Sequence, residues 1–262
     1  METTSFADGA ILVESGRVAK VLINRQDKRN AINAAMWSAL LDACDFISKS
    51  DGTRVVVLSG AGKHFCAGAD ITEFADTYRS QASADRYNGR YRDVEDALRR
   101  IPCPVIAEVR GACFGGGLGL ALSADFRFSD STAMISITAS KLGIAYGAED
   151  SARLIEKIGP VRAKDLLFSA RTVGVDEAMA WGLVDQVFPP GELASGVRAY
   201  AETLASRSPA SLKAIKSIVN SLIEPSSSLC ERLRPTYSEL FAGSDLREGA
   251  RAFLEKREPL FK

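Results

Sequence analysis

The sequence predicts an α/β fold whose C-terminal part is helical, and three observations support this prediction. Short apolar runs such as Val55–Gly60 and Val105–Val109 are typical of parallel strands that are buried on both faces. Between them lie longer stretches in which apolar residues recur at helical spacing. From about Ser151 onward helical patterns dominate, which indicates an α/β domain with a helical appendage. We therefore place a core domain over residues 1–195 and a C-terminal helical region over residues 196–262.

The N-terminal half alternates between strands and helices. Two strands separated by a turn at Ser15–Gly16 come first, and a helix with a regular apolar stripe follows. The next elements are a buried strand and a second helix, which ends before Pro102 because proline cannot continue a helix. In order, the predicted elements cover residues 11–23, 31–48, 55–60 and 78–100.

The C-terminal half begins with a strand and a glycine-rich turn that leads into a short helix. Two further strands precede the helical region, within which the run Val184–Phe188 predicts one more short strand. The predicted strands cover residues 105–109, 126–128, 134–137 and 184–188. One predicted helix follows the glycine-rich turn and ends at residue 121. The other predicted helices cover residues 151–158, 193–207, 211–223 and 231–256.

The charge balance and the hydropathy pattern argue against nucleic-acid and membrane partners. Lysine plus arginine and aspartate plus glutamate each total 33 residues, so the net charge is zero, whereas nucleic-acid-binding proteins usually carry a basic excess. No apolar run approaches the roughly 20 residues that span a bilayer, and the N-terminus lacks the basic and apolar regions of a signal peptide. We therefore expect a cytoplasmic protein with neither nucleic acid nor membrane as a partner.

The cysteines and the single histidine exclude several classes of site. Five cysteines are scattered along the chain without the spacing of a zinc site, so we expect free thiols and no bound metal. His64 is the only histidine, and no GxSxG motif is present. A hydrolase built on a histidine-containing triad is therefore disfavoured.

Two glycine-containing turns stand where strands lead into helices, at Lys63–Ile71 and Gly111–Gly119. Glycines there allow positive φ and close approach of a ligand, and the first N–H groups of a helix lack intrahelical partners. Two such N–H donors aimed at one point form an oxyanion hole. Either turn alone could equally be a packing device, and neither fits the GxGxxG fingerprint of dinucleotide binding.

Together, in this order and spacing, several segments resemble the enoyl-CoA hydratase/isomerase (crotonase) superfamily along nearly the whole chain. They are residues 24–33, 65–70, 115–117, 178–185 and 253–257. The resemblance implies a crotonase-type spiral of repeated ββα units with a C-terminal helical trimerisation region, assembled as a homotrimer or a dimer of trimers. It also implies an acyl-CoA thioester substrate in fatty acid metabolism, with coenzyme A belonging to the substrate and no separate cofactor.

The resemblance also assigns residues to the site. Its two oxyanion-hole donors correspond to the backbone N–H groups of Ala69 and Gly116. Lys28 and Arg29 would lie near the coenzyme A phosphates, with a solvated charged turn as the alternative, and Lys256 would reach a phosphate across a subunit boundary. The full set that the resemblance implies for coenzyme A binding is Lys28, Arg29, Ala31, Ala67, Gly68, Ala69, Asp70, Ile71 and Lys256.

The chain departs from the family at the residues that move protons. The two glutamates of the family's hydratases correspond to Gly119 and Ala139, neither of which carries an acid, so ordinary hydration is not expected. These two small residues also predict extra room for a bulky or carboxylated acyl group. Family isomerases and dehalogenases carry a carboxylate in the next loop, at the position of Gly147, and some decarboxylases carry a tyrosine at residue 146.

Three residues of the loop 142–150 are therefore our candidates for proton transfer: Tyr146, Glu149 and Asp150. The alternatives are that the two acids merely begin the next helix, where they favour its dipole, and that the tyrosine only lines the pocket. Three functions stay open. In the first, the chain is an enzyme, by family an enoyl-CoA hydratase/isomerase, and it isomerises, decarboxylates or hydrolyses its thioester. In the second it binds acyl-CoA without catalysis, and in the third it is a scaffold subunit.

Overall fold

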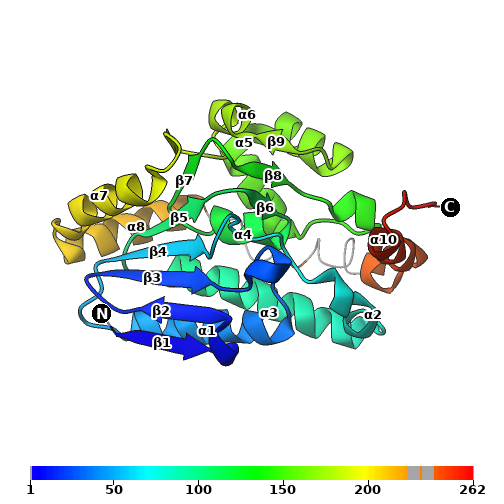
Figure 1. Cartoon of the computed structure of the whole chain (residues 1–262), viewed down its shortest axis with the longest axis horizontal. Coiled ribbons are helices and arrows are strands. Elements are labelled where there is room, and N and C mark those ends of the chain that lie inside the picture. The colour runs from blue at the N-terminus through cyan, green and yellow to red at the C-terminus, as the bar shows by residue number, and fades with distance from the viewer. Residues whose placement is uncertain (1, 224–230, 232–238, 262) are drawn as a thin grey trace.

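Two β-sheets form the centre of the chain in the computed structural model, which describes residues 2–223, 231 and 239–261 (Figure 1). Among these residues, the larger sheet has seven strands in the order β1–β2–β3–β4–β5–β7–β10. They are β1 (Thr3–Phe6), β2 (Ile11–Glu14), β3 (Val18–Ile23), β4 (Val55–Gly60), β5 (Val105–Val109), β7 (Phe126–Asp130) and β10 (Gln186–Phe188). The smaller sheet, in the order β6–β8–β9, contains β6 (Ala112–Phe114), β8 (Met134–Ser136) and β9 (Val173–Gly174).

Parallel pairing dominates the larger sheet. The pairings β1–β2 and β2–β3 are antiparallel, and every later pairing from β3 to β10 is parallel. After β5 the chain adds β6 to the smaller sheet and then forms α4 (Gly116–Leu122). After β7 it adds β8 and then forms η4 (Ala139–Leu142) and α5 (Ala148–Ser169). This repetition of two strands and a helix is the predicted ββα spiral.

Helices cover both faces of the larger sheet, as the wholly buried β4 requires. Val56 and Leu58 belong to the main core with α1 (Ala34–Ser48) and α3 (Gln81–Arg100), while Val55 and Val57 pack with α7 (Leu193–Ala205). Further helical segments are η1 (Ala7–Gly9), η2 (Gln26–Lys28), η3 (Ile71–Glu73), α2 (Phe74–Thr77), α6 (Val175–Trp181), α8 (Pro209–Ile223), η5 (Glu239–Ala242) and α10 (Ser244–Glu255). Within the described ranges, no helix is both long enough and apolar enough to cross a membrane.

Most predicted elements are confirmed, and capping groups explain where their ends differ. The helix expected from residue 31 begins at Ala34, because the Asn33 side chain accepts the N–H of Met36 (2.9 Å) and caps it. The helix expected from residue 78 begins at Gln81, because Ser80 and Ser83 form a capping box. β1, β6 and β9, of four, three and two residues, are additional to the predicted strands.

The C-terminal helices differ more from the prediction. The single helix predicted over residues 231–256 is wrong for much of its described part, where η5 and α10 are separated by Gly243. Residues 232–238 of that prediction lie outside the described ranges. α5 begins at Ala148 rather than at Ser151. The predicted domain boundary after residue 195 falls inside α7, whose buried residues pack on the larger sheet.

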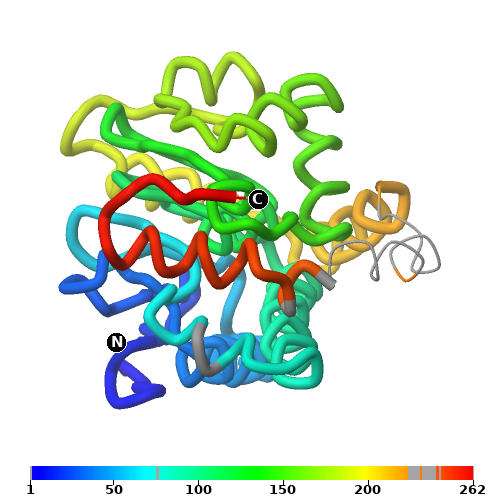
Figure 2. Tube along the Cα trace, turned by 90° about the vertical axis from the view of Figure 1, so that its right-hand side faces the viewer, coloured from blue at the N-terminus to red at the C-terminus, as the bar shows by residue number. Residues whose placement is uncertain are grey.

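α10 lies across one end of the molecule and packs against η4 (Figure 2). The contact is close because both sides carry glycine. A Cβ on Gly249 would lie 2.5 Å from the Cα of Leu142, and a Cβ on Gly143 would lie 2.5 Å from the Cβ of Asp245. α10 therefore holds in place the loop that follows η4, and this loop carries part of the site described below.

Candidate active site

The two glycine-containing turns lie side by side. The N–H of Cys66 donates to the carbonyl of Ala112 in β6 (3.0 Å), which joins the first turn to the smaller sheet. Gly117 allows α4 to approach, because a Cβ there would overlap the Cys66 carbonyl oxygen. Each turn also contains a glycine in the left-handed region, Gly68 at φ +96° and Gly115 at φ +48°. The turns therefore form one tightly packed unit that tolerates few side chains.

Two backbone N–H groups of this unit, those of Ala69 and Gly116, have no acceptor among the described residues. Gly116 is the first residue of α4, so its N–H is one of the donors that a helix leaves unpaired at its positive end. Gly68 brings the first turn close, since a Cβ on it would lie 3.4 Å from the Gly116 nitrogen. Ala69 and Gly116 both line one cavity, so a ligand oxygen bound there could accept from both.

The cavity is lined mostly by aromatic and small residues. Trp37 donates from Nε1 to the hydroxyl of Tyr87 (2.9 Å), and its ring packs edge-on against Tyr91 with centroids 5.0 Å apart. The aromatic lining residues come from five segments and are Trp37, Phe74, Tyr78, Tyr87, Tyr91, Tyr146 and Phe241. Such a lining suits an apolar ligand whose polar part reaches the two N–H groups.

A buried cluster of ionisable side chains from α3 and α5 adjoins the cavity. Tyr91 donates to Asp150 Oδ1 (3.1 Å), and the Arg153 guanidinium lies 2.6 Å from Glu95 Oε2 and 3.2 Å from Asp150 Oδ1. Glu95 is fully buried, and its other oxygen, Oε1, has no hydrogen-bond partner among the described residues. Asp150 lines the cavity, and the hydrogen bonds that it accepts within the described chain go to Oδ1, which leaves Oδ2 for a ligand.

The cluster fills the space beside Gly119, one of the two positions that the resemblance matches to the glutamates of the family's hydratases. A Cβ on Gly119 would overlap the Tyr91 hydroxyl and Glu95 Oε1. The prediction of extra room at Gly119 is therefore wrong, because side chains from α3 already occupy it. Ala139, the second position, lies at the start of η4 and lines the cavity.

Asp150 lies close to the loop position at which the family's isomerases carry a carboxylate. That position corresponds to Gly147, which caps α5, and Asp150 is one helical turn further along. The Asp150 side chain reaches back along the helix, so that a Cβ on Gly147 would lie 3.1 Å from Asp150 Oδ2. Asp150 is three residues after Gly147 in the sequence, but one turn of helix brings its carboxylate back to the space beside Gly147.

Burial determines the protonation of this cluster. It raises the pKa of the Asp150 carboxyl well above its ordinary value, and the charge of Glu95 raises this pKa further, against the opposing effect of Arg153. Burial also raises the pKa of the Tyr91 and Tyr146 hydroxyls. These two tyrosines keep their protons at neutral pH, and the shift at Asp150 likewise favours the protonated form of its carboxyl.

The three proton-transfer candidates all line the cavity, but they differ in their surroundings. Asp150 belongs to the buried cluster. Tyr146 donates its hydroxyl proton to the Gly115 carbonyl (3.2 Å), so it supports the N-terminus of α4. Glu149 is half-buried in the first turn of α5, where acids favour the helix dipole.

The sequence reasoning missed three members of the buried cluster: Tyr91, which lines the cavity, and Glu95 and Arg153 behind it. One signal was available in the sequence. Glu95 lies between Val94 and Leu98 on the buried stripe of α3, and a charge in such a stripe requires a partner. The partner itself, Arg153, lies on another helix, and the sequence does not show which helices meet.

The predicted coenzyme A residues include an exposed basic turn next to the first glycine turn. Lys28 and Arg29 are exposed, and the buried Asn30 that follows them donates from Nδ2 to the carbonyl of His64 (2.7 Å). The Ala67 N–H donates to the Arg29 carbonyl (3.0 Å). The basic turn is therefore held against the backbone of the first glycine turn, and Ala31 continues it as a half-buried residue.

The other predicted coenzyme A residues fall into two groups. Four of them line the cavity: Ala67, Gly68, Ala69 and Ile71. Asp70 and Lys256 are not among its lining residues, and Lys256 is exposed at the end of α10. The Asp70 carboxylate pairs with Arg25 (2.6 Å). Burial alone would raise the pKa of Asp70, but hydrogen bonds from Thr72 and Arg25 outweigh it and lower this pKa.

Known proteins share this architecture. The family model for enoyl-CoA hydratase/isomerase matches residues 14–262. The chain is 31% identical to short-chain-enoyl-CoA hydratase of Clostridium acetobutylicum over 96% of each chain. It is 32% identical to the mitochondrial Delta(3,5)-Delta(2,4)-dienoyl-CoA isomerase of Homo sapiens, over 92% of this chain and 77% of the relative.

Solved structures agree with the sequence relatives. Methylmalonyl-CoA decarboxylase in complex with 2-nitronate-propionyl-CoA matches with a TM-score of 0.86 at 26% identity, over 97% of this chain and 98% of that one. An enoyl-CoA hydratase of Mycobacterium avium subsp. paratuberculosis matches with a TM-score of 0.85 at 26% identity, over 97% and 98%. The ββα spiral, the paired glycine turns and these matches lead to one assignment: the chain belongs to the enoyl-CoA hydratase/isomerase family of the crotonase superfamily.

Proposed function

We propose that the protein moves a double bond along the acyl chain of an enoyl-CoA thioester, by forming an enolate and reprotonating it. One observation carries the proposal: a carboxyl group, that of Asp150, lines the same cavity as the unpaired N–H groups of Ala69 and Gly116. An enolate isomerase needs these two functions, a group that carries one proton and donors that stabilise the oxyanion.

The thioester oxygen would accept hydrogen bonds from the Ala69 and Gly116 N–H groups. Removal of a proton from the carbon next to the thioester places negative charge on that oxygen, and a fixed donor stabilises such charge by about 3 kcal/mol. Both donors belong to the backbone of closely packed glycine turns, so they need no reorganisation when the charge develops.

Isomerisation fits the cluster better than hydration does. The family's hydratases use two glutamates, and the corresponding positions here are Gly119 and Ala139. Moving a double bond needs only one carboxyl, which takes a proton from one carbon and returns it to another. The direction of the pKa shift at Asp150 supports this role, because burial moves the pKa of the carboxyl upward from its ordinary acidic range, and acid–base catalysis is most efficient when the pKa is near the operating pH.

Coenzyme A would bind along the basic turn and the first glycine turn. Lys28 and Arg29 supply positive charge for its phosphates, and the backbone of residues 67–71 lies next to them. Lys256 of a neighbouring subunit would complete the site in a homotrimer or a dimer of trimers.

The reaction that we propose requires no cofactor beyond the coenzyme A of the substrate. We place this reaction in cytoplasmic fatty acid metabolism, without a nucleic-acid or membrane partner.

Decarboxylation of a malonyl-type thioester is a second candidate, and Arg92 favours it. This half-buried side chain lines the cavity and forms no ion pair with a described residue. A guanidinium in that position could hold a substrate carboxylate. Loss of carbon dioxide would leave the same enolate, stabilised by the same N–H groups, and one structural relative is a methylmalonyl-CoA decarboxylase.

The test is incubation of the purified protein with 3-enoyl-, 2-enoyl- and malonyl-type CoA thioesters, followed by mass spectrometry and by the absorbance of the conjugated product. We expect 3-enoyl-CoA to become 2-enoyl-CoA. Asp150→Asn should lower this turnover by about 10²–10⁴-fold, the usual contribution of a general acid–base group. Glu149→Gln, the matched change at the neighbouring acid, should have little effect.

Each other outcome reassigns the reaction. Loss of carbon dioxide from the malonyl-type thioester, with no change in 3-enoyl-CoA, would favour decarboxylation and make Arg92 the next residue to change. Thioesters that bind and return unchanged would support the binding-protein alternative. Isomerisation that survives Asp150→Asn but not Glu149→Gln would transfer the catalytic role to Glu149.

A further inference from the structure

We infer that Glu95 is a positioning residue: it shares one proton with Asp150, so that the two buried carboxyls act as a single proton-carrying pair. The inference rests on the proposed function for its catalytic consequence, but the pair itself follows from the packing of α3, α4 and α5. No residue of the family's usual glutamate positions takes part, since those positions are Gly119 and Ala139.

The geometry brings both carboxyls to one point. The Cβ that Gly119 lacks would overlap Glu95 Oε1 and the Tyr91 hydroxyl, and it would lie 3.2 Å from Asp150 Oδ1. Three oxygen atoms from two helices therefore surround the space beside a residue that has no side chain. Glycine at 119 is what allows the carboxyls of Glu95 and Asp150 to approach each other.

The charges in this space do not balance if both carboxyls are ionised. Arg153 is the buried cation that faces them, and its side chain is 7% exposed. Asp96 lies 3.4 Å from the same guanidinium but is half exposed, so water also solvates its charge. The remaining ionisable groups facing the pair are the hydroxyls of Tyr91 and Tyr146, which are neutral. Two buried carboxylates against one buried cation leave an uncompensated charge, which a proton removes.

The hydrogen bonds also require a proton. Glu95 Oε1 is buried and has no partner in the described part of the chain. The single hydroxyl proton of Tyr91 is given to Asp150 Oδ1 (3.1 Å), and Arg153 already contacts the other oxygen of Glu95. An ionised carboxylate has no donor of its own. A proton held between Glu95 and Asp150 satisfies Oε1 and leaves Asp150 Oδ2, which accepts no hydrogen bond from a described residue, as the oxygen that can take a substrate proton.

The shared proton has a consequence for the reaction. When the substrate C–H bond breaks, its proton forms an O–H bond at Asp150 Oδ2 and the electron pair passes into the enolate. The pair then holds two protons. Return of one proton to the distant carbon breaks that O–H bond, and the pair again holds one. The pH profile of isomerisation should therefore have an acid limb, where the free pair gains its second proton, and an alkaline limb, where it loses the first.

The first test is Glu95→Gln, which keeps the size of the side chain and gives it a permanent donor in place of the shared proton. We expect the variant to retain most of its turnover at neutral pH. The acid limb of its kcat/KM profile should stay in place, and the alkaline limb, which reports loss of the shared proton, should disappear, because only Asp150 now titrates. Glu95→Ala, which leaves Arg153 unpaired, should lose most of its turnover.

Asp96→Asn is the matched control, because it also removes a carboxylate that contacts Arg153 from α3. It should keep both limbs of the wild-type profile. A wild-type profile in Glu95→Gln would overturn the inference, and so would a folded Glu95→Gln protein without turnover, because Glu95 would then have to ionise.

A second measurement separates this inference from the proposed reaction. Infrared difference spectra of wild type against Glu95→Gln, and of wild type against Asp150→Asn, report protonated carboxyl groups without any substrate. We expect a carboxylic-acid C=O band at neutral pH that is absent from both variants. If the wild type shows this band but isomerises no thioester, the carboxyl pair is supported and the proposed reaction is rejected. If the wild type lacks the band, the carboxyl pair is rejected.

Discussion

At Gly119 and Gly147 the chain has no side chain; a carboxylate from another residue occupies the space at the first position and lies directly against it at the second. Glu95 reaches the first position from α3, together with the Tyr91 hydroxyl, and Asp150 reaches the second from the next turn of α5. The resemblance to the family's hydratases predicts that their catalytic glutamates correspond here to residues without an acid, Gly119 and Ala139. If the proposed reaction is correct, the acids come from other backbone positions, which would be a change of position rather than a loss of acidic groups.

Gly119→Ala tests whether this arrangement is rigid. Its Cβ would overlap Tyr91 and Glu95, which are hydrogen-bonded or ion-paired and cannot move without breaking those contacts. We expect a loss of about 1–3 kcal/mol in the free energy of unfolding, the usual cost of overpacking, although alanine favours a helix. Denaturant unfolding measures this difference.

Gly52→Ala is the control for that substitution, because its Cβ would meet nothing within 4 Å and its φ is not positive. It should leave the stability unchanged or slightly higher. A Gly119→Ala protein as stable as this control would mean that the cluster rearranges freely, and the carboxyl pair would then lack a fixed geometry.

At the scale of helices and strands, the register of three helices decides which side chains meet. Tyr91 and Glu95 are four residues apart on α3, so they lie on one face, and Asp150 and Arg153 are three apart on α5. α4 passes between them with glycine at 119. α10 then covers η4 and its loop through the close contacts at Gly143 and Gly249.

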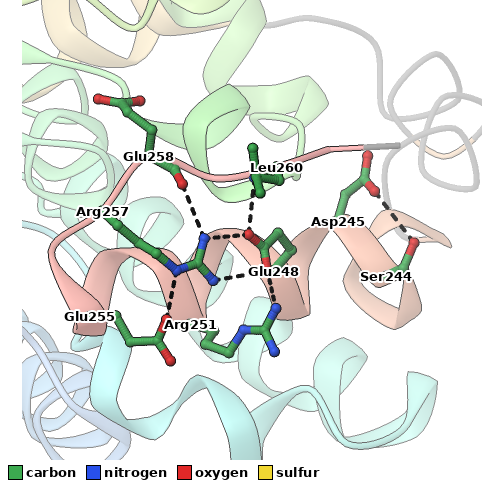
Figure 3. A network of polar contacts seen from close by, with 8 residues as sticks. All are labelled: Ser244, Asp245, Glu248, Arg251, Glu255, Arg257, Glu258 and Leu260. Atoms are coloured by element: carbon green, nitrogen blue, oxygen red, sulfur yellow. Dashed lines mark hydrogen bonds and ion pairs between the residues drawn. The ribbon is translucent and has the colours of Figure 1, made fainter.

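The C-terminal tail is fastened to α10 by the carboxylate of Glu248 (Figure 3). Arg257 contacts it at 2.7 Å, and the backbone N–H of Leu260 donates to it at 2.9 Å. Hydrogen bonds from Arg257, then from Leu260 and Arg251, hold the pKa of Glu248 far below its ordinary value. The tail is therefore held by a group that stays ionised in all but strongly acidic solution.

Glu248→Gln should release this tail. We expect faster hydrogen exchange at the amides of residues 256–258, 260 and 261 at pH 7, because the charge-assisted contacts are lost. The pH dependence follows from the depressed pKa. The contribution of Glu248 is complete above its unfolded-state pKa of about 4.3, and it is lost as the pH falls through the lower folded-state value. The exchange-rate ratio of variant to wild type should thus approach one in acid.

Glu255→Gln is the comparison for this experiment. Its side chain is 52% exposed and contacts Arg257 alone among the described residues of the tail (2.6 Å). We expect a smaller change in exchange than for Glu248→Gln. Equal changes in the two variants would show that Arg257, rather than the carboxylate of Glu248, holds the tail.

At the scale of the whole molecule, the parts that could be predicted from the sequence are those with local signals. β4 and β5 are continuous apolar runs, and the two glycine turns stand at strand ends. β6 and β9 are too short to show alternation, and their pairing depends on strands distant in the sequence. Asp150 was a candidate, with Tyr146 and Glu149, because its loop resembles one that carries a carboxylate in the family. Glu95 was missed because its role depends on α5 and α4 packing against α3.

One face of α8 is apolar and exposed, and this face is a candidate surface for contacts between copies of the chain. Lys216 attaches the helix to the body through Asp125 (2.8 Å) and the Cys103 carbonyl (3.1 Å). On another face, four residues at helical spacing have exposures of 48–80%: Ile215, Ile218, Val219 and Leu222. Exposed apolar stripes of this kind mark interaction surfaces. This face is where we place contacts between copies of the chain in the trimer or dimer of trimers that we propose.

Ile218→Glu with Leu222→Glu tests that placement. Two charges in an apolar interface lose hydration without gaining partners, so the double variant should have a lower mass in solution than the wild type, as measured by light scattering after size exclusion. Ser217→Glu, on the opposite side of the same helix, should keep the wild-type mass. If Lys256 of a neighbouring subunit binds a phosphate of coenzyme A, the dissociated variant should also have a raised KM. An unchanged mass in the double variant would place the contacts between subunits on a different surface.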